Sequence, residues 1–271
     1  MRYFIRTHNR LLDLSSPCVM AIINITPDSF YTSCATLSEN EILSVAEKAI
    51  HEGADILDIG ACSTRPGSTP ILTSEEWQRL SIGLGSIRYH WPDVIISVDT
   101  FRADIAHQAI VLGADIINDV YGGKADQSMW DVVAKHQVPY ILTHSNTIPK
   151  DCHTMSHLLA DLQKDVDELH KRGIADVIID PGFGFGKSES QNYDILQQLD
   201  ILKNLRAPIL AGVSRKSMLY KPLHISPEQA LPATIAAQTL ALERGANILR
   251  VHDVAAAKQT IAIHMLTNKQ S

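Results

Sequence analysis

Apolar and polar positions along the chain follow two periods, and a short motif repeats where these periods meet. Its first copy, Gly-Ala-Asp-Ile-Leu-Asp-Ile, begins at Gly53, and similar segments begin at Gly113, Gly173 and Gly245, at spacings of 60, 60 and 72 residues. Each copy has a glycine that can end a helix, then an apolar strand, then polar residues at the strand's end. One βα unit takes about 30 residues, so a 60-residue spacing predicts another strand between copies.

Apolar runs occupy the predicted places. They cover residues 94–99, 140–144 and 209–213, and residues 19–25 precede the first copy. The segments between the strands have helical periodicity, and residues 38–41 and 73–76 have the pattern of capping boxes that open two of the helices. Together with the four repeat copies, these runs predict eight parallel strands alternating with helices.

This pattern predicts an α/β fold, a (β/α)8 TIM barrel that forms a single domain over residues 1–271. An open doubly wound sheet is the alternative. A short N-terminal extension at residues 1–17 precedes the barrel, and we expect residues 2–14 to form a small hairpin or an extended lead-in.

Composition narrows the classes of function. The chain has 271 residues, 45% of them hydrophobic, and a net charge of −6, which favours neither nucleic acid nor an anionic membrane as a partner. It contains no run of about 18 apolar residues, and its N-terminus lacks the apolar stretch of a signal peptide. The four cysteines are far apart and form no Cys-x-x-Cys pair. We therefore expect a reduced, cytoplasmic protein.

Polar residues follow the predicted strands, at the face where such barrels carry their chemistry. The candidates are Asn24, Thr64, Arg65, Asp99, Asn118, His144, Asp180, Lys216, Arg250 and His252. Asp99, Asn118, Asp180 and Lys216 suit a flat heterocycle with an edge of N–H donors, because a carboxylate can accept two parallel N–H bonds. Arg250 and His252 suit a diphosphate, and the amide oxygen of Asn24 suits Mg²⁺.

Structural explanations compete with these roles. Asp99 and Asp119 could be helix N-caps, His144 could be a core histidine, and residues 250–253 could form a surface cluster of ion pairs. Cys62 is expected to pack rather than to act as a nucleophile, because no base lies near it in sequence. The clustering of all the candidates at one rim favours a shared site.

A glycine-rich segment follows the strand that ends at Asp180. It runs Asp-Pro-Gly-Phe-Gly-Phe-Gly-Lys and ends at Lys187. Backbone N–H groups and a lysine suit an anion, but the glycine spacing misses that of a phosphate-binding loop by one residue. A flexible loop is the alternative.

Seven segments give the chain a specific resemblance. It resembles the dihydropteroate synthase family over about residues 19–254, in segments that occur in the family's order. They are residues 24–30 (NITPDSF), 63–67 (STRPG), 97–100 (SVDT), 117–119 (IND), 180–187 (DPGFGFGK), 214–217 (SRKS) and 250–253 (RVHD). The resemblance implies a (β/α)8 barrel and a transferase of folate biosynthesis. This enzyme joins 6-hydroxymethyl-7,8-dihydropterin diphosphate to 4-aminobenzoate and releases diphosphate.

The resemblance also implies residue roles. Asp99, Asn118, Asp180 and Lys216 would hold the pterin, Asn24 would bind Mg²⁺, and Arg250 and His252 would hold the diphosphate with Thr64 close by. The catalytic group would be Asp99, Lys216, Arg250 and His252. Phe30, Arg65, Pro66, Phe185 and Ser217 would frame the aminobenzoate site, which sulfonamides would share. A homodimer formed through the outer helices is implied as well.

Three departures from the family pattern concern loops and one pocket wall. The residues after Phe30 are Tyr-Thr-Ser-Cys (31–34), where the family usually has Ser-Asp-Gly-Gly, Cys62 replaces a common glutamate, and Ser145 replaces a usual methionine. We therefore expect intact pterin binding, with altered affinity for aminobenzoate and sulfonamides. Two alternatives remain: a pterin-binding methyltransferase of the corrinoid type and a non-catalytic pterin-binding homologue.

Overall fold

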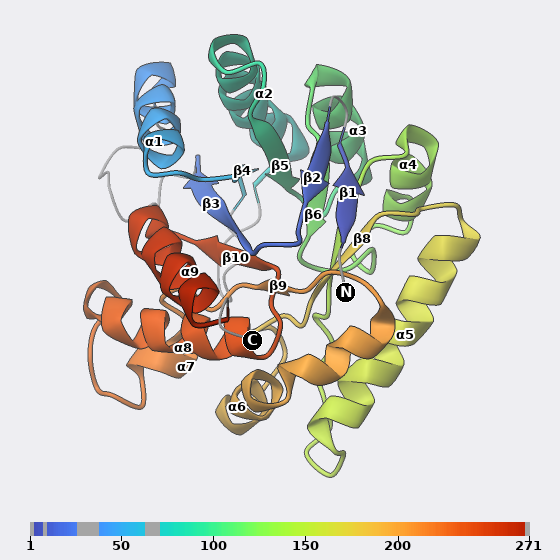
Figure 1. Cartoon of the computed structure of the whole chain (residues 1–271). Helices are drawn as coiled ribbons and strands as arrows, with labels where there is room; N and C mark the ends of the chain where they lie inside the picture. The colour runs from blue at the N-terminus through green and yellow to red at the C-terminus, as the bar shows by residue number, and fades with distance from the viewer. Residues whose placement is uncertain (1–2, 8–9, 26–37, 63–70, 269–271) are drawn as a thin grey trace.

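The structure is a computed structural model that describes residues 3–7, 10–25, 38–62 and 71–268. Eight parallel strands form a ring inside a layer of helices (Figure 1). They are β3 (Cys18–Asn24), β4 (Ile56–Gly60), β5 (Ile95–Asp99), β6 (Ile116–Asp119), β7 (Tyr140–Thr143), β8 (Val177–Asp180), β9 (Leu210–Ala211) and β10 (Ile248–Val251). A bridge between Ile179 and Ile209 joins β8 to the segment that leads into β9 and closes the ring. The predicted (β/α)8 barrel is confirmed.

Helices follow the strands around the ring. They are α1 (Glu39–His51), α2 (Thr73–His90), α3 (Ala103–Leu112), α4 (Met129–His136), α5 (Thr154–Lys171), α6 (Glu189–Gln197), α7 (Ser217–Tyr220), α8 (Leu231–Glu243) and α9 (Val254–Asn268), with 3-10 turns η1 (Leu199–Leu205) and η2 (Pro227–Ala230). Ser38 forms the predicted capping box with Glu41. The second predicted box is wrong, because α2 already begins at Thr73 and its N-cap is Leu72, without a side-chain cap. No helix among the described residues is long and apolar enough to cross a membrane.

The repeat has a structural explanation at its third position. The side chains of Asp55, Asp115 and Asn247 accept hydrogen bonds from the backbone N–H groups of Val19, Ile96 and Ile209, at 2.8–2.9 Å. Each acceptor belongs to the turn before one strand, and each donor lies near the start of the neighbouring strand. The repeated Asp or Asn therefore joins successive βα units at the N-terminal end of the barrel.

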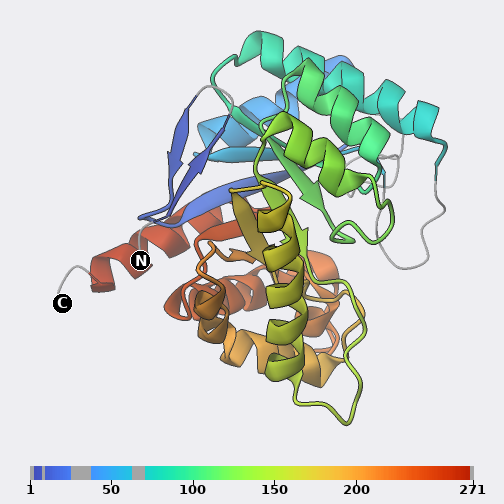
Figure 2. The same cartoon turned by 90° about the vertical axis from the view of Figure 1, so that its right-hand side faces the viewer.

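The interior of the barrel has an apolar floor. Every strand contributes to it through one of the residues Met20, Ile56, Ile95, Ile116, Ile141, Ile178, Leu210 and Ile248, and β3 adds Cys18. Ile5 and Leu14 from the N-terminal segment belong to the same cluster. That segment forms the predicted hairpin, with β1 (Phe4–Arg6) antiparallel to β2 (Leu11–Asp13), at one end of the barrel (Figure 2). The hairpin therefore covers the floor from the N-terminal end.

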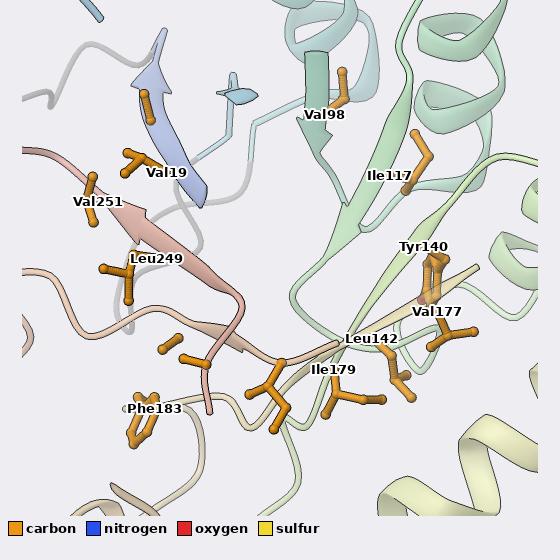
Figure 3. Packing of buried hydrophobic residues seen from close by; sticks show 14 of the residues in the cluster. Val19, Val98, Ile117, Tyr140, Leu142, Val177, Ile179, Phe183, Leu249 and Val251 are labelled. Carbon is orange, nitrogen blue, oxygen red and sulfur yellow. The ribbon is translucent and has the colours of Figure 1, made fainter. Parts of the chain in front are cut away.

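The alternate residues of the strands point outward, because side chains switch faces with period two. Val98, Ile117, Val177 and Leu249 project away from the ring towards the helices (Figure 3). Each such side chain stabilises the fold by about 1.5–3 kcal/mol when fully buried. This layer anchors the strands rigidly, so their inward residues have fixed positions above the floor.

Candidate active site

Two residues beyond the floor, the same alternation places polar side chains inside the barrel. Asp58, Ser97, Asn118, Asp180 and Arg250 each follow a floor residue at this spacing. Four of these side chains are buried, and Arg250 is half-buried. A layer of polar groups therefore lies directly above an apolar layer, towards the C-terminal ends of the strands.

The pairing register of the strands places further candidate residues above this polar layer. Asn24, Gly60 and Asp99 are direct partners across β3, β4 and β5, and Asn118 is the partner of Asp99 on β6. Gly60 keeps this level open, because a Cβ atom there would lie 3.4 Å from the Asp99 Cβ and 3.8 Å from the Asn24 Oδ1. The side chains of Asn24 and Asp99 therefore adjoin one space.

Arg250 is the cation at the centre of this arrangement. Its Nε donates to the Asp58 Oδ2 and its Nη2 to the Asp99 Oδ2, both at 2.6 Å. Asn118 donates from Nδ2 to the same Asp58 oxygen at 3.0 Å. Against the lowering effect of burial, the two carboxylates raise the pKa of Arg250. Arg250 thus belongs to the barrel interior rather than to a surface cluster of ion pairs.

Several polar atoms in this interior have no hydrogen-bond partner among the described residues. They are Asp58 Oδ1, Ser97 Oγ, Asp99 Oδ1 and Thr143 Oγ1. Buried polar atoms are nearly always paired in folded proteins. Their common location indicates a space that a polar ligand or water fills.

Burial also perturbs the carboxyl groups. It raises the pKa of Asp99 to about 7, against the opposing effect of the Arg250 guanidinium, and the Asp58 carboxylate adds to the rise. Burial likewise raises the pKa of Asp180, although the Gly182 N–H and the Lys216 ammonium oppose it. Both carboxyl groups can accept hydrogen bonds from N–H donors of a ligand, and such bonds favour the ionised form of a carboxyl group. Asp99 is no helix N-cap, since α3 is preceded by Arg102 at that position.

The glycine-rich segment after Asp180 is held by Lys187. Its Nζ donates to the carbonyl oxygens of His144, Gly182 and Phe185 at 2.7, 3.1 and 2.9 Å. Gly182 has a φ of +71° and passes so close to the His144 carbonyl that a Cβ atom would lie 2.1 Å from its oxygen. The expectation that this lysine binds an anion is therefore wrong: it ties the loop to the end of β7.

The segments after β9 and β10 are joined to each other. Arg215 forms a two-pronged ion pair with Asp253, with both contacts at 2.9 Å, and the Ser214 hydroxyl lies 3.1 Å from the His252 Nδ1. These contacts fix Lys216 and His252 on adjacent segments. The Lys216 Nζ lies 4.6 Å from the centre of the Phe185 ring, and Ser217 is the first residue of α7.

The candidate His144 has a structural role, and so does Asp119, the candidate helix N-cap. His144 is buried and its Nε2 lies 3.1 Å from the Asp161 Oδ2, so the core interpretation is correct. Asp119 points outward, accepts a hydrogen bond from the Tyr140 hydroxyl at 2.8 Å and is not a helix N-cap. Burial and the Glu76 carboxylate raise the pKa of the Cys62 thiol, which opposes a thiolate nucleophile.

Other predictions lie outside the described residues. These are Phe30, Thr64, Arg65, Pro66 and the altered loop at residues 31–34. Sequence reasoning also missed one residue, Asp58, although a signal was present. Asp58 occupies the fifth place after Gly53, as Asn118 does after Gly113 and Arg250 after Gly245.

A separate pocket of about 440 Å³ lies between the start of α5 and helix α6. Its lining includes Lys150, His153, Ser190 and Asp194, and none of the predicted site residues. Among the described residues, no group of three or more His, Cys, Asp or Glu side chains could hold a metal ion.

Comparison with known proteins gives one family. The family described as pterin binding enzyme matches residues 20–252. A dihydropteroate synthase of Haemophilus influenzae is 36% identical over 269 residues, covering 96% of this chain and 97% of that protein. One of Clostridium beijerinckii is 36% identical over 239 residues, covering 87% of this chain and 88% of that protein.

Solved structures agree in fold. The dihydropteroate synthase of Yersinia pestis with a sulfonamide drug superposes with a TM-score of 0.93 at 32% identity, covering 99% of this chain and 100% of that one. The enzyme of Coxiella burnetii with pteroic acid gives 0.90 at 35% identity, with the same coverage. That of Xanthomonas albilineans with 4-aminobenzoic acid gives 0.91 at 34% identity, covering 99% of each chain.

Proposed function

The chain belongs to the family of pterin-binding enzymes, and we propose that it catalyses the dihydropteroate synthase reaction of folate biosynthesis. In this transfer, 6-hydroxymethyl-7,8-dihydropterin diphosphate and 4-aminobenzoate give 7,8-dihydropteroate and diphosphate. The observation that carries the proposal is the layer of hydrogen-bond acceptors around the Arg250 cation, above the apolar floor. Its chemistry matches a flat heterocycle that carries an anionic tail.

The pterin ring is proposed to lie against Asp99, Asn118 and Asp180. The amino group and ring N–H of a pterin form a donor edge, and a carboxylate can accept two parallel N–H bonds from such an edge. Asp99 has a buried oxygen without a partner among the described residues, and the Asp180 Oδ1 already accepts from the Gly182 N–H at 2.7 Å. Lys216, beside the Phe185 ring, would bind an acceptor of the pterin.

The diphosphate is proposed to bind at the mouth, near Arg250 and His252, with Thr64 close to them. A guanidinium carries five N–H donors, and the contacts to Asp58 and Asp99 use two of these. The Ser214 hydroxyl holds the Nδ1 side of the His252 ring. Such fixed donors stabilise charge that develops on a departing phosphate.

A Mg²⁺ ion is proposed to assist at Asn24. The Asn24 amide oxygen adjoins the open space above Gly60, and Mg²⁺ commonly takes one protein oxygen together with phosphate oxygens and water. The ion would neutralise charge on the leaving diphosphate. This arrangement fits the described residues, which offer no group of three or more His, Cys, Asp or Glu side chains for a metal ion.

The aminobenzoate is proposed to bind beside Phe185 and Ser217, with Phe30, Arg65 and Pro66 completing its pocket. The aniline nitrogen attacks the pterin methylene carbon, the C–O bond breaks, and both bonding electrons leave with the diphosphate. The nitrogen then loses one proton to water. An aniline is already nucleophilic, so positioning and stabilisation of the leaving group supply most of the acceleration. Sulfonamides would compete for this pocket.

Assembly and location are proposed from the same family membership. The outer helices α8 and α9 expose Leu240, Ile263 and Leu266, between 54% and 64% accessible. Burial of such side chains against a second copy would stabilise a homodimer. We propose a cytoplasmic enzyme whose partners are its small-molecule substrates.

The test is diphosphate release from purified protein with both substrates and Mg²⁺. We expect turnover that requires 4-aminobenzoate and is lost in Lys216→Ala and Arg250→Ala variants. Turnover that survives both substitutions would refute the site. Pterin binding without turnover would indicate the non-catalytic alternative, and methyl transfer from a reduced folate would indicate the methyltransferase.

A further inference from the structure

Three copies of the repeat meet inside the barrel at one position. Asp58, Asn118 and Arg250 each stand five residues after a repeat glycine, on β4, β6 and β10. In the structure Asp58 contacts the other two: its Oδ2 accepts from the Asn118 Nδ2 at 3.0 Å and from the Arg250 Nε at 2.6 Å. One carboxylate oxygen thus joins two candidate substrate-binding side chains from opposite sides of its own strand.

The contact with Asp58 determines how the Asn118 amide is oriented. An ionised carboxylate only accepts hydrogen bonds, whereas an amide has a donor end and an acceptor end. The NH₂ group of Asn118 must therefore face Asp58, which leaves its carbonyl oxygen on the other side. Asp58 is fully buried, so water cannot easily replace it as the partner.

The same carboxylate directs Arg250. The guanidinium spans Asp58 and Asp99, at 2.6 Å from each. Because its side chain is held at two points, its remaining donors have fixed directions. Loss of Asp58 would leave Arg250 attached to Asp99 alone and would free the Asn118 amide to rotate.

We propose that Asp58 is a positioning residue for pterin recognition, which presents the carbonyl oxygen of Asn118 to the donor edge of the ring and fixes Arg250. This inference rests on the proposed function. A rotated Asn118 would place N–H groups against the N–H groups of the ligand. Sites built for hydrogen bonding lose much of their affinity when a buried group is left unpaired.

The test compares Asp58→Asn with a matched control, Asp115→Asn. Asp115 is also buried and also pairs with an arginine, Arg88, at 2.6 Å, but it stands before β6 at the N-terminal end of the barrel. The dissociation constant of pterin diphosphate with Mg²⁺ is measured by titration without aminobenzoate. We expect it to rise at least about tenfold in Asp58→Asn and to stay within twofold in the control. The KM for 4-aminobenzoate at saturating pterin diphosphate should stay within twofold in both.

Unchanged pterin affinity in Asp58→Asn would overturn the role of Asp58 alone. Failure of the unaltered protein to bind pterin diphosphate would overturn the proposed function, and this inference with it. If Asp58→Asn does not fold, the test is the rate at which the Asn118 side-chain NH₂ protons of the unaltered protein exchange with solvent. Their NMR signal is assigned because it is absent from the Asn118→Asp variant. Slow exchange before ligand is added supports the proposal. Fast exchange that slows only when the pterin binds would overturn it.

Discussion

Replacing Arg250 by methionine tests the charge balance inside the barrel. Methionine keeps much of the length of the side chain but removes the only cation that contacts both Asp58 and Asp99 among the described residues. Asp58 is 0% exposed and Asp99 is 8% exposed. The variant therefore leaves two buried carboxyl groups without the cation that contacts both of them.

Removal of one partner from a buried ion pair costs about 3–5 kcal/mol. For a chain of this size, that loss lowers the melting temperature by roughly 10 °C. The loss should depend on pH. Burial and the Asp58 carboxylate raise the pKa of Asp99 above its unfolded value of about 4, and the variant lacks the Arg250 guanidinium that opposes this rise, so the folded form binds more protons. The free energy of unfolding then falls as pH rises from about 4 towards the folded pKa.

The assay is urea unfolding at about pH 5.5 and about pH 8, conditions on either side of the raised pKa of Asp99. We expect Arg250→Met to lose more stability at the higher pH and a further substitution, Asp58→Asn, to restore part of it. Arg88→Met is the control, because it also takes an arginine away from a buried carboxylate, Asp115, which keeps a backbone N–H bond at 2.9 Å. Wild-type stability in Arg250→Met, or a loss that does not change with pH, would refute the reasoning.

Three further predictions address the loop and the ligand site. Lys187→Met should lower the free energy of unfolding by about 2–4 kcal/mol and weaken pterin binding, because three hydrogen bonds that hold the loop are lost. The control Lys171→Met, at an exposed position, should change neither. Thermal melts and ligand titration measure both variants, and equal stability of the two would contradict the loop's dependence on Lys187. Burial raises the pKa of Asp99 to about 7, and ligand N–H groups favour its ionised form. Pterin binding should therefore release protons and become tighter as pH rises from about 5.5 to about 7.5. Calorimetry in two buffers measures whether protons are released or taken up on binding, and proton uptake would contradict this prediction. Gly182→Ala should lower the free energy of unfolding by about 2–3 kcal/mol, because the added Cβ would lie against the His144 carbonyl oxygen. Gly85→Ala has nothing within 4 Å of the added carbon and should stabilise helix α2. Urea unfolding measures both variants, and an unchanged stability of Gly182→Ala would contradict the close contact.

The fold could be predicted because two signals in the sequence are independent and agree. Strand periodicity gave eight apolar runs, and the repeat placed Gly53, Gly113, Gly173 and Gly245 at spacings of about two βα units. Local capping was less predictable. Ser38 caps α1 as predicted, but α2 begins at Thr73 itself, because several residues at a helix start can satisfy the same pattern.

The site could be predicted only in part. Strand-end position identified Asp99, Asn118 and Asp180, which do line the interior. It did not distinguish inward from outward side chains, so His144 was included although it contacts Asp161 outside the ring. It also missed Asp58, because that residue lies two positions before the end of β4.

The lysine of the glycine-rich segment shows a further limit. A lysine after several glycines suits an anion, but the Lys187 Nζ contacts three carbonyl oxygens, one of them from the residue that follows β7. Sequence spacing does not reveal such a partner, because His144 lies 43 residues earlier in the chain. The parallel pairing of β7 with β8 brings the two segments together.

The most direct test of the account is a crystal structure of the protein with 6-hydroxymethyl-7,8-dihydropterin diphosphate and Mg²⁺. The account predicts that the pterin ring lies above the apolar floor, with its N–H groups within hydrogen-bond distance of Asp180 and the side-chain carbonyl oxygen of Asn118. A ring bound elsewhere, such as in the pocket beside Lys150 and Asp194, with the barrel interior filled only by water, would contradict it.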